Sequence, residues 1–503
     1  MSSILDLFVD LPALVGLAGL VNLAIGLAIG VLIGALPGVG PLLGVVMAIP
    51  FTYYMDPVPA MALLMGIYQG GSYGGALSAT ILGIPGTPLA ASTLLDARPM
   101  ALRGKASEAV TLSTIGSSVG GILSALVLIA VAPWLAKIAL KFGPAETAAF
   151  ALLGLTTLGA LSGGSPLKGW MMGFVGLAIA TIGLDPMTGV SRFGYGSIYF
   201  DSGVQLVPML VGIFALSEVA IQAEQQVRAH DTKSGIGTSL SAFSSLLTRP
   251  FTYLRSAAMG VFIGILPGLG GVSASFLSYR IEKLFKRKSD PAFGEGNPGG
   301  VIACETSNSA VTGGALIPML SLSIPGDPIV AVLMGGLLLQ GVVPGPRMFL
   351  TDPEVVRGIF AVFLAGSILL LPIGLLFIRA IIRVLVLPQW AIMASVVMIS
   401  LVGTYAVQRE IMDIYVLIFF GFVGYVFRKF DFPLSPIVIG FVLGPIFEEK
   451  FRRTVLISQG DLFGYLLNRP IALTVLIVTA LFVILPMLGA LARRRRRPAL
   501  TTG

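Results

Sequence analysis

The chain has 503 residues, of which 55% are hydrophobic and only 11% charged, and its mean hydropathy is +0.94. A soluble domain carries roughly 25% charged residues, so most of this chain must be solvated by lipid. The net charge of +8 does not indicate a nucleic-acid partner, because Lys and Arg gather in loops between apolar runs, as in membrane proteins.

Rare residue types exclude several site chemistries. The single cysteine, Cys304, excludes an intrachain disulfide and a cysteine-rich metal site, and the single histidine, His230, lies in a polar loop. We therefore expect no zinc or haem centre, no histidine-based triad and no organic cofactor. The N-terminus carries acidic residues where a signal peptide would be basic, so we expect no signal peptide.

Apolar runs approach the roughly 20 residues that a helix needs to cross a bilayer. In chain order they lie near 14–34, 108–132, 145–162, 167–184, 204–222, 354–378, 388–407, 411–427 and 470–491, with shorter or broken runs near 58–84, 252–284, 297–320 and 329–344. Strands of a β-barrel would be shorter and would alternate in polarity. The sequence predicts an all-α polytopic membrane protein with about 10–12 transmembrane helices, some of them re-entrant or broken.

The first break follows the first apolar run, at Gly34-Ala35-Leu36-Pro37-Gly38-Val39-Gly40. A Pro-Gly pair ends a helix, because proline lacks a backbone donor and glycine adopts conformations that other residues avoid. Non-helical backbone at membrane depth is tolerated only where protein buries it or where it lines a wet cavity. Gly38 is therefore a candidate substrate-site residue.

The run near 58–84 carries the polar cluster Tyr68-Gln69-Gly70-Gly71-Ser72-Tyr73-Gly74-Gly75. Polar groups in such surroundings must pair with one another, with backbone or with a ligand. Ser72 and Tyr73 are candidate substrate ligands, although small residues also allow membrane helices to pack closely.

A second break follows at Ile84-Pro85-Gly86-Thr87-Pro88. Thr87 suits an N-cap and Pro88 a first helical position, which predicts a helix that runs through Leu95. The unpaired N–H groups at its start would suit a carboxylate, so Gly86 and Thr87 join the candidate substrate site.

A polar stretch from Gln222 to Pro250 divides the chain and is interpreted as a cytoplasmic linker. We expect a first membrane repeat over 1–221, the linker over 222–250, a second membrane repeat over 251–492 and a basic cytoplasmic tail over 493–503. The tail contains an Arg run directly after the last span, which indicates a cytoplasmic C-terminus.

The second half repeats three motifs of the first half in the same order. They are Gly264-Ile265-Leu266-Pro267-Gly268-Leu269-Gly270, then Gly313-Gly314-Ala315-Leu316 for Gly74-Gly75-Ala76-Leu77, then Ile324-Pro325-Gly326-Asp327-Pro328. An ordered triple indicates an internal duplication, and repeated halves place one midplane site in many secondary transporters. Inverted and parallel repeats both remain open, because basic residues flank both ends of the last span.

The segment from Thr252 to Phe285 is too long for one crossing. As a single helix it would rise about 50 Å, against a hydrocarbon core of roughly 30 Å. With Pro267-Gly268 in its middle, it is interpreted as a helical hairpin that returns to the side it entered from. A single kinked helix is the alternative.

The second half supplies further candidate ligands. Ser307, Asn308 and Ser309 lie in a polar cluster that begins at Glu305, and Gly268 and Gly326 are the counterparts of Gly38 and Gly86. Asp327 would favour a coupling cation such as sodium, unless it only caps its own helix. Glu305 is a second candidate for that ion, as a protonatable carrier, a partner of a basic side chain or a residue near a wet surface.

At these residues the chain resembles the TctA family, the large membrane subunit of the tripartite tricarboxylate transporters. One signature runs from Gly34 to Ala109 and the other from Gly264 to Pro346, including LLLQGVVPGP. The resemblance implies a bacterial inner-membrane permease that works with a small four-helix membrane subunit (TctB-like) and a periplasmic solute receptor (TctC-like), driven by an ion gradient. Asp327 departs from the small hydroxyl residue usual in the family.

The sequence therefore predicts a multi-pass permease, not an enzyme, that imports an organic acid anion by alternating access as a symporter, with sodium or a proton as the coupling ion. Citrate, other di- or tricarboxylates and aromatic acids all remain open as substrates. A passive anion channel and a membrane-embedded enzyme are the alternatives. The channel would need a continuous polar path, and no paired catalytic motif supports the enzyme.

Overall fold

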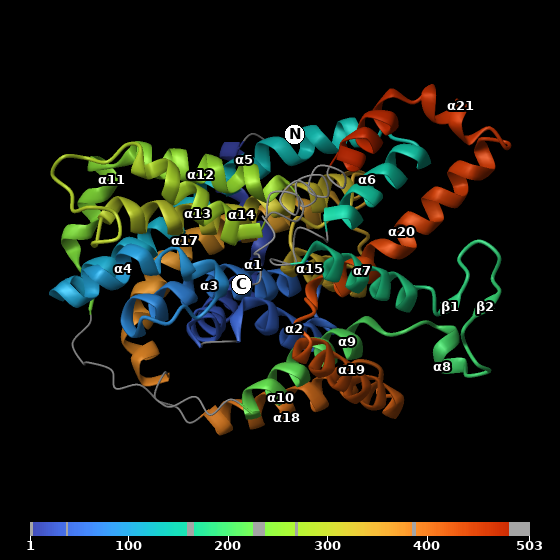
Figure 1. Cartoon of the computed structure of the whole chain (residues 1–503), viewed down its shortest axis with the longest axis horizontal. Helices are drawn as coiled ribbons and strands as arrows, with labels where there is room; N and C mark the ends of the chain where they lie inside the picture. Colours follow the sequence, from blue (N-terminus) through green and yellow to red (C-terminus); the bar gives the residue numbers. More distant parts are fainter. Residues whose placement is uncertain are drawn as a thin grey trace, which may run out of the picture. The chain divides into compact units, whose positions relative to one another are not determined.

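The computed structural model describes residues 4–36, 39–157, 165–224, 237–266, 270–384 and 389–481. In these ranges the secondary structure is helical apart from one two-stranded hairpin (Figure 1). Six helical segments of this described part are long and apolar enough to cross a membrane: Pro12–Ala35, Leu94–Ala139, Leu206–Glu224, Pro353–Ile381, Trp390–Gln408 and Ile411–Lys429. Shorter apolar helices accompany them, so the predicted all-α polytopic membrane fold is confirmed.

The chain divides into two compact units, and each predicted repeat contributes to both. Unit 1 comprises Met1–Leu140 with Val204–Leu434, and unit 2 comprises Lys141–Gly203 with Ser435–Gly503. The boundaries proposed above for the repeats, the linker and the tail stay predictions. Residues 237–249 of the linker region belong to unit 1, where the backbone N–H groups of Gly237 and Ser239 donate to the hydroxyls of Ser107 and Thr111, both at 3.0 Å.

Unit 1 holds the elements that carry the polar clusters. From the first half they are α1 (Ile4–Ala35), α2 (Gly40–Thr52), α3 (Pro57–Leu82), the 3₁₀ helix η1 (Pro88–Ala91), α4 (Leu94–Met100), the π-helical η2 (Ala101–Lys105) and α5 (Ala106–Ala139), then α9 (Leu206–Leu210), η4 (Val211–Leu216) and α10 (Ser217–Glu224). From the second half they are η5 (Leu240–Ser244), α11 (Ser245–Thr248), α12 (Pro250–Ile265), α13 (Gly270–Lys283), α14 (Pro298–Leu322), α15 (Pro328–Leu339), α16 (Met348–Thr351), α17 (Pro353–Val384), α18 (Gln389–Gln408) and α19 (Ile411–Lys429).

Helices α1 and α2 form a hairpin against α3. A Cβ atom added to Gly26, Gly30 or Gly34 would lie 2.3, 2.5 or 2.2 Å from the carbonyl oxygens of Leu63, Ile67 and Gly71 respectively, so α1 runs parallel to α3 in close backbone contact. Helix α2 runs the opposite way, because Gly71 lies against Pro41 whereas the earlier Ile67 lies against the later Gly44.

Helices α12 and α13 form the corresponding hairpin against α14. An added Cβ at Gly260 or Gly264 would lie 2.4 or 2.7 Å from the carbonyl oxygens of Ser307 and Val311, so α12 is parallel to α14. Gly271 lies beside Asn308, whereas the later Ser278 donates to the carbonyl of the earlier Ala303 at 3.1 Å, so α13 is antiparallel to α14. The hairpin interpretation of Thr252 to Phe285 is confirmed, and the single kinked helix is wrong.

The two halves correspond at an offset of 240 residues along α3 and α14. Gly83 and Ser323 end these helices in the same left-handed conformation, with φ of 77° and 62°. Gly74 packs on the carbonyl of Val31 as Gly314 packs on that of Val261, so Gly74 corresponds to Gly314. The repeated motif Gly-Gly-Ala-Leu had aligned Gly74 with Gly313, one residue away. The register of the two helices is fixed by backbone contacts, which the motif alone does not show.

The halves are inverted relative to each other and interleaved. Helix α14 is parallel to α5, since Gly116 contacts Glu305 and Ser124 contacts Gly313. Helix α3 is parallel to α17, since Val58 contacts Gly358 and Tyr73 contacts Gly374. Helices α5 and α17 are antiparallel, because Gly121 lies at Ser367 and the earlier Thr114 lies at the later Gly374. It follows that α3 and α14 point in opposite directions, which resolves the orientation of the repeats.

Unit 2 contains α6 (Pro144–Thr156), α7 (Pro166–Ala180), β1 (Gly183–Leu184), β2 (Ser191–Arg192), α8 (Ile198–Asp201), α20 (Ser435–Ile457) and α21 (Leu462–Leu467). Helices α7 and α20 touch through glycines, because an added Cβ at Gly176 would lie 2.1 Å from the carbonyl oxygen of Ile437.

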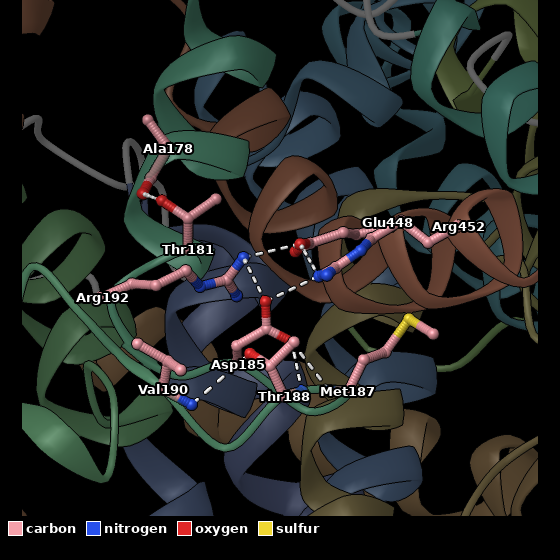
Figure 2. A network of polar contacts seen from close by, with 9 residues as sticks. All are labelled: Ala178, Thr181, Asp185, Met187, Thr188, Val190, Arg192, Glu448 and Arg452. Carbon is pink, nitrogen blue, oxygen red and sulfur yellow. Dashed lines mark hydrogen bonds and ion pairs between the residues drawn. The ribbon is translucent and has the colours of Figure 1, made fainter.

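A network of charged side chains joins the β-hairpin of unit 2 to α20 (Figure 2). Arg452 lies 2.7 Å from Asp185 and 3.1 Å from Glu448, and Arg192 lies 2.6 Å from Glu448. Hydrogen bonds to the Asp185 carboxylate lower its pKa to about 2. The bond from Arg452 has the largest effect, and the bond from the backbone N–H of Met187 has the next largest.

Candidate functional site

The candidate site lies where both half-repeats interrupt their helices. Each junction after α3 and α14 rests on the end of a hairpin: an added Cβ at Gly86 would lie 2.2 Å from the carbonyl oxygen of Gly34, and one at Gly326 would lie 2.7 Å from that of Gly264. Glycine is required at both positions because a side chain would collide with backbone. The predicted residues Gly38 and Gly268 lie outside the described residues.

Ser72 links the two halves through its backbone. Its carbonyl oxygen accepts a hydrogen bond from Asn308 Nδ2 at 2.9 Å, while its hydroxyl donates to the carbonyl of Tyr68 at 2.8 Å on its own helix. Tyr73 points elsewhere, because its hydroxyl pairs with Thr114 Oγ1 of α5 at 2.7 Å. The structure thus brings Ser72 to Asn308, and it places the Tyr73 hydroxyl at the packing contact between α3 and α5.

Glu305 is fully buried and bonded to hydroxyl groups. Thr93 donates to one carboxylate oxygen, and Ser117 donates to the other at 3.1 Å. Because Asn308 is three residues further along α14, the two side chains share a helix face, and the Asn308 side chain hydrogen-bonds to the Glu305 carboxylate. A buried carboxylate whose partners are all neutral is costly, so this position calls for a proton or a bound cation.

Asp327 caps its own helix. One carboxylate oxygen accepts from the N–H of Val330 at 2.8 Å, and the other accepts from the hydroxyl of Tyr68, a residue of the first half. The predicted helix cap is therefore present, and the assignment of a coupling cation to Asp327 stays a prediction.

Thr87 differs from its counterpart Asp327. The predicted continuous helix from Thr87 to Leu95 is wrong: η1 ends at Ala91 and α4 begins at Leu94. Thr87 occupies the N-cap position, but its side chain makes no capping hydrogen bond, and η1 is too short to present a helix terminus. Only 1% of Thr87 is exposed, and its hydroxyl has no hydrogen-bond partner among the described residues.

Buried polar atoms without partners gather on these elements. In the described part of the chain they include Gln69 Oε1, Thr87 Oγ1, Thr306 Oγ1, Ser307 Oγ, Asn308 Oδ1 and Ser309 Oγ. Such atoms are rare in native proteins, and each one calls for water, an ion or a ligand. Ser307, Asn308 and Ser309 succeed one another at about 100° around α14, so they cannot all serve one ligand.

Thr93, Ser117 and Thr114 were not predicted from the sequence. A signal for two of them was present in the apolar run of 108–132, where Ser113, Thr114, Ser117 and Ser118 recur at helical spacing. Spacing of this kind marks a polar stripe on one face of a membrane helix. It does not tell which residue in the other half the stripe meets.

Inverted halves with broken helices that meet at a buried polar site are typical of membrane transporters. Over residues 20–439 the chain matches the model of the tripartite tricarboxylate transporter TctA family. The protein belongs to the TctA family, and it is therefore a multi-pass membrane subunit of a transporter type that contains further subunits.

Two relatives come from Agrobacterium vitis. An uncharacterized 52.8 kDa protein in the TAR-I ttuC′ 3′ region is 33% identical over 456 residues, which cover 90% of this chain and 89% of the relative. An uncharacterized protein in the TAR-II ttuC′ 3′ region is 36% identical over 236 residues, which cover 47% of this chain and 97% of the relative. No solved structure matches the chain.

Proposed function

We propose that this protein is the permease subunit of an inner-membrane importer of organic acid anions, of the di- or tricarboxylate type, that works by cation-coupled alternating access. A small four-helix membrane subunit and a periplasmic solute receptor complete the transporter. The family assignment supports the tripartite organisation. The observation that carries the mechanism is the meeting of two inverted half-repeats at junctions surrounded by buried, unpaired polar side chains.

In this mechanism the receptor delivers the anion to the periplasmic face, and polar groups from both halves hold it near the midplane of the membrane. Thr87 and Asn308 contact the substrate. Glu305 exchanges the coupling ion, because its carboxyl group is hydrogen-bonded to Asn308 and its other partners, Thr93 and Ser117, are likewise neutral. An ionised Glu305 would repel a substrate carboxylate, whereas a protonated or cation-bound one would not.

The test is uptake into proteoliposomes that contain the permease, the small subunit and the receptor, under an imposed sodium or proton gradient. Accumulation of a labelled organic acid above its external concentration is expected, and a passive channel would only equilibrate it. Replacing Thr87 by Val or Asn308 by Leu is expected to reduce uptake by about tenfold or more. If both variants transport as well as the parent, the site assignment is wrong.

A further inference from the structure

The inverted halves place two pairs of residues at corresponding positions. The offset of 240 residues relates Tyr68 to Asn308 and Thr87 to Asp327, as it relates Gly83 to Ser323. The pair formed by Tyr68 and Asp327 therefore corresponds to the pair formed by Asn308 and Thr87. In one pair, the Tyr68 hydroxyl donates to the Asp327 carboxylate, so the chain fills that position with its own donor and acceptor. In the other pair, Thr87 Oγ1 and Asn308 Oδ1 are both buried and have no partner among the described residues.

Thr87 and Asn308 both lie against the same stretch of α3. The Asn308 amide donates to the carbonyl of Ser72, and an added Cβ at Gly75 would lie 2.5 Å from Thr87 Oγ1. Ser72 and Gly75 are three residues apart, so the two side chains rest about one helical turn from each other. Leu89 and Gly271 close the same region, since an added Cβ at Gly271 would lie 2.5 Å from Leu89 Cδ2 and 3.5 Å from Asn308 Oδ1.

The two unpaired atoms require different partners. A threonine hydroxyl can donate a hydrogen bond to a carboxylate, but an amide oxygen can only accept one. The orientation of the Asn308 amide is fixed, because turning it over would place its oxygen against the carbonyl oxygen of Ser72. A bare carboxylate would therefore satisfy Thr87 and leave Asn308 Oδ1 unpaired.

We propose that this open position takes one carboxylate of the transported acid together with an adjacent hydroxyl: Thr87 donates to the carboxylate, and Asn308 Oδ1 accepts from the hydroxyl. The Tyr68–Asp327 pair is the closed counterpart of this subsite. The protein is then specific for hydroxycarboxylic acids, and Asn308 is the residue that recognises the hydroxyl. This inference rests on the proposed transport function.

The experiment compares acids that differ only in the hydroxyl: malate with succinate, and citrate with tricarballylate. Binding is measured by titration calorimetry on the purified membrane subunits without receptor, so that receptor specificity does not enter. For the pair whose hydroxy acid binds better, we expect the affinity for the hydroxy acid to exceed the affinity for its matched analogue by about tenfold or more, because the analogue leaves a buried acceptor unpaired.

Asn308→Leu is expected to bring the ratio of the two affinities close to one, whereas the control Asn22→Leu, at an amide on α1, keeps the parental ratio. Thr87→Val is expected to weaken both acids of a pair equally, and Thr87→Ser to restore them. Thr87→Asp places a carboxylate where the substrate carboxylate binds, and it is expected to abolish binding. Because Thr87→Ser and Thr87→Val change little volume, they test the subsite even if Asn308→Leu does not fold.

Equal affinity of the parent for both members of each pair would overturn the proposal. So would a preference that survives Asn308→Leu, including the case in which this variant alters only the sodium dependence of binding. Absence of receptor-dependent uptake for every organic acid would instead remove the proposed function. These outcomes separate an error about the subsite from an error about transport.

Discussion

Three buried carboxyl groups of unit 1 show how partners decide the role of a residue. Asp96 accepts hydrogen bonds from the N–H groups of Gly294, Gly296 and Asn297 at 2.8 to 2.9 Å, which fixes the loop before α14. Asp327 caps α15 and is bonded to Tyr68. Glu305 is bonded to neutral side chains, the hydroxyls of Thr93 and Ser117 and the amide of Asn308, so of these three carboxyl groups it can exchange a proton or cation without breaking a backbone contact.

Glu305→Gln is expected to uncouple transport from the ion gradient. Glutamine keeps the size of the side chain and can still hydrogen-bond to Thr93 and Ser117, but it cannot bind a proton or balance a cation. Uphill uptake should fall by about tenfold or more, while exchange of labelled for unlabelled substrate across the vesicle membrane continues. Both rates are measured in the same proteoliposomes. Uphill uptake at the parental rate would show that Glu305 is not the coupling group.

The sequence predicted the helix breaks but not the side-chain partners. Proline and glycine signal a break locally, so the ends of α1, α3, α12 and α14 could be placed from the motifs. The bond from Asn308 to Ser72 joins residues 236 positions apart, and no local pattern specifies it. Asp327 illustrates the limit: its capping role was foreseen, whereas its bond to Tyr68 required the inverted packing.

At the scale of elements, close contact between backbones holds each hairpin to its long helix. Glycines at 26, 30 and 34 let α1 approach α3, and Gly260 and Gly264 do the same for α12 and α14. Helix packing in a membrane depends on such contacts, because lipid competes equally well for apolar side chains. The length of the segment from Thr252 to Phe285 predicted that the chain reverses direction within it. That α12 runs parallel to α14 is seen only in the structure.

Gly30→Ala is expected to destabilise the protein by about 1–3 kcal/mol, because its Cβ would lie 2.5 Å from the carbonyl oxygen of Ile67 and the two helices would have to separate. Thermal unfolding of the purified protein measures the change. The matched control is Gly19→Ala on the same helix, where the nearest atom, at 2.8 Å, is a methyl group of Val15 that can rotate away. Equal unfolding temperatures for the two variants would contradict this packing argument.

The charged network of unit 2 predicts a pH-dependent stability (Figure 2). The pKa of Asp185 is lowered from 3.8 to about 2, so the charged form is favoured in the folded protein and stabilises it above the ordinary pKa. Asp185→Asn should therefore lower the unfolding temperature at neutral pH. The difference from the parent should shrink as the pH falls from about 4 toward about 2, where the parental carboxyl also becomes neutral.

Unfolding temperatures of both proteins between pH 7 and about 3 check this expectation. Glu410→Gln, at an exposed residue of unit 1, is the control and should change the unfolding temperature little across the same range. A difference that stays constant down to the lowest pH would show that the Asp185 charge does not stabilise the fold.

At the scale of the whole molecule, the two repeats pack into one shared core within unit 1. Helix α5 of the first half packs on α14 of the second, and α17 of the second packs on α1 and α3 of the first. The polar contacts follow the same exchange, from Asn308 to Ser72 and from Tyr68 to Asp327. The sequence predicted two separate multi-helix repeats and not their interleaving. Duplicated motifs show that the two halves are related in sequence, but they do not show which helix surfaces pack together.

Cutting the chain between residues 230 and 231 tests the interleaving. Each fragment alone would expose buried polar side chains, including Glu305 and Asn308, to lipid or to one another without their partners, at a cost of several kcal/mol. We expect neither fragment to accumulate when expressed alone. Together the fragments should pair, co-purify and restore receptor-dependent uptake, because the contacts that join them need no covalent link. Stable accumulation and uptake by a single fragment would mean that each repeat folds and works independently, and the inverted, interleaved arrangement would then not be the basis of the transport site.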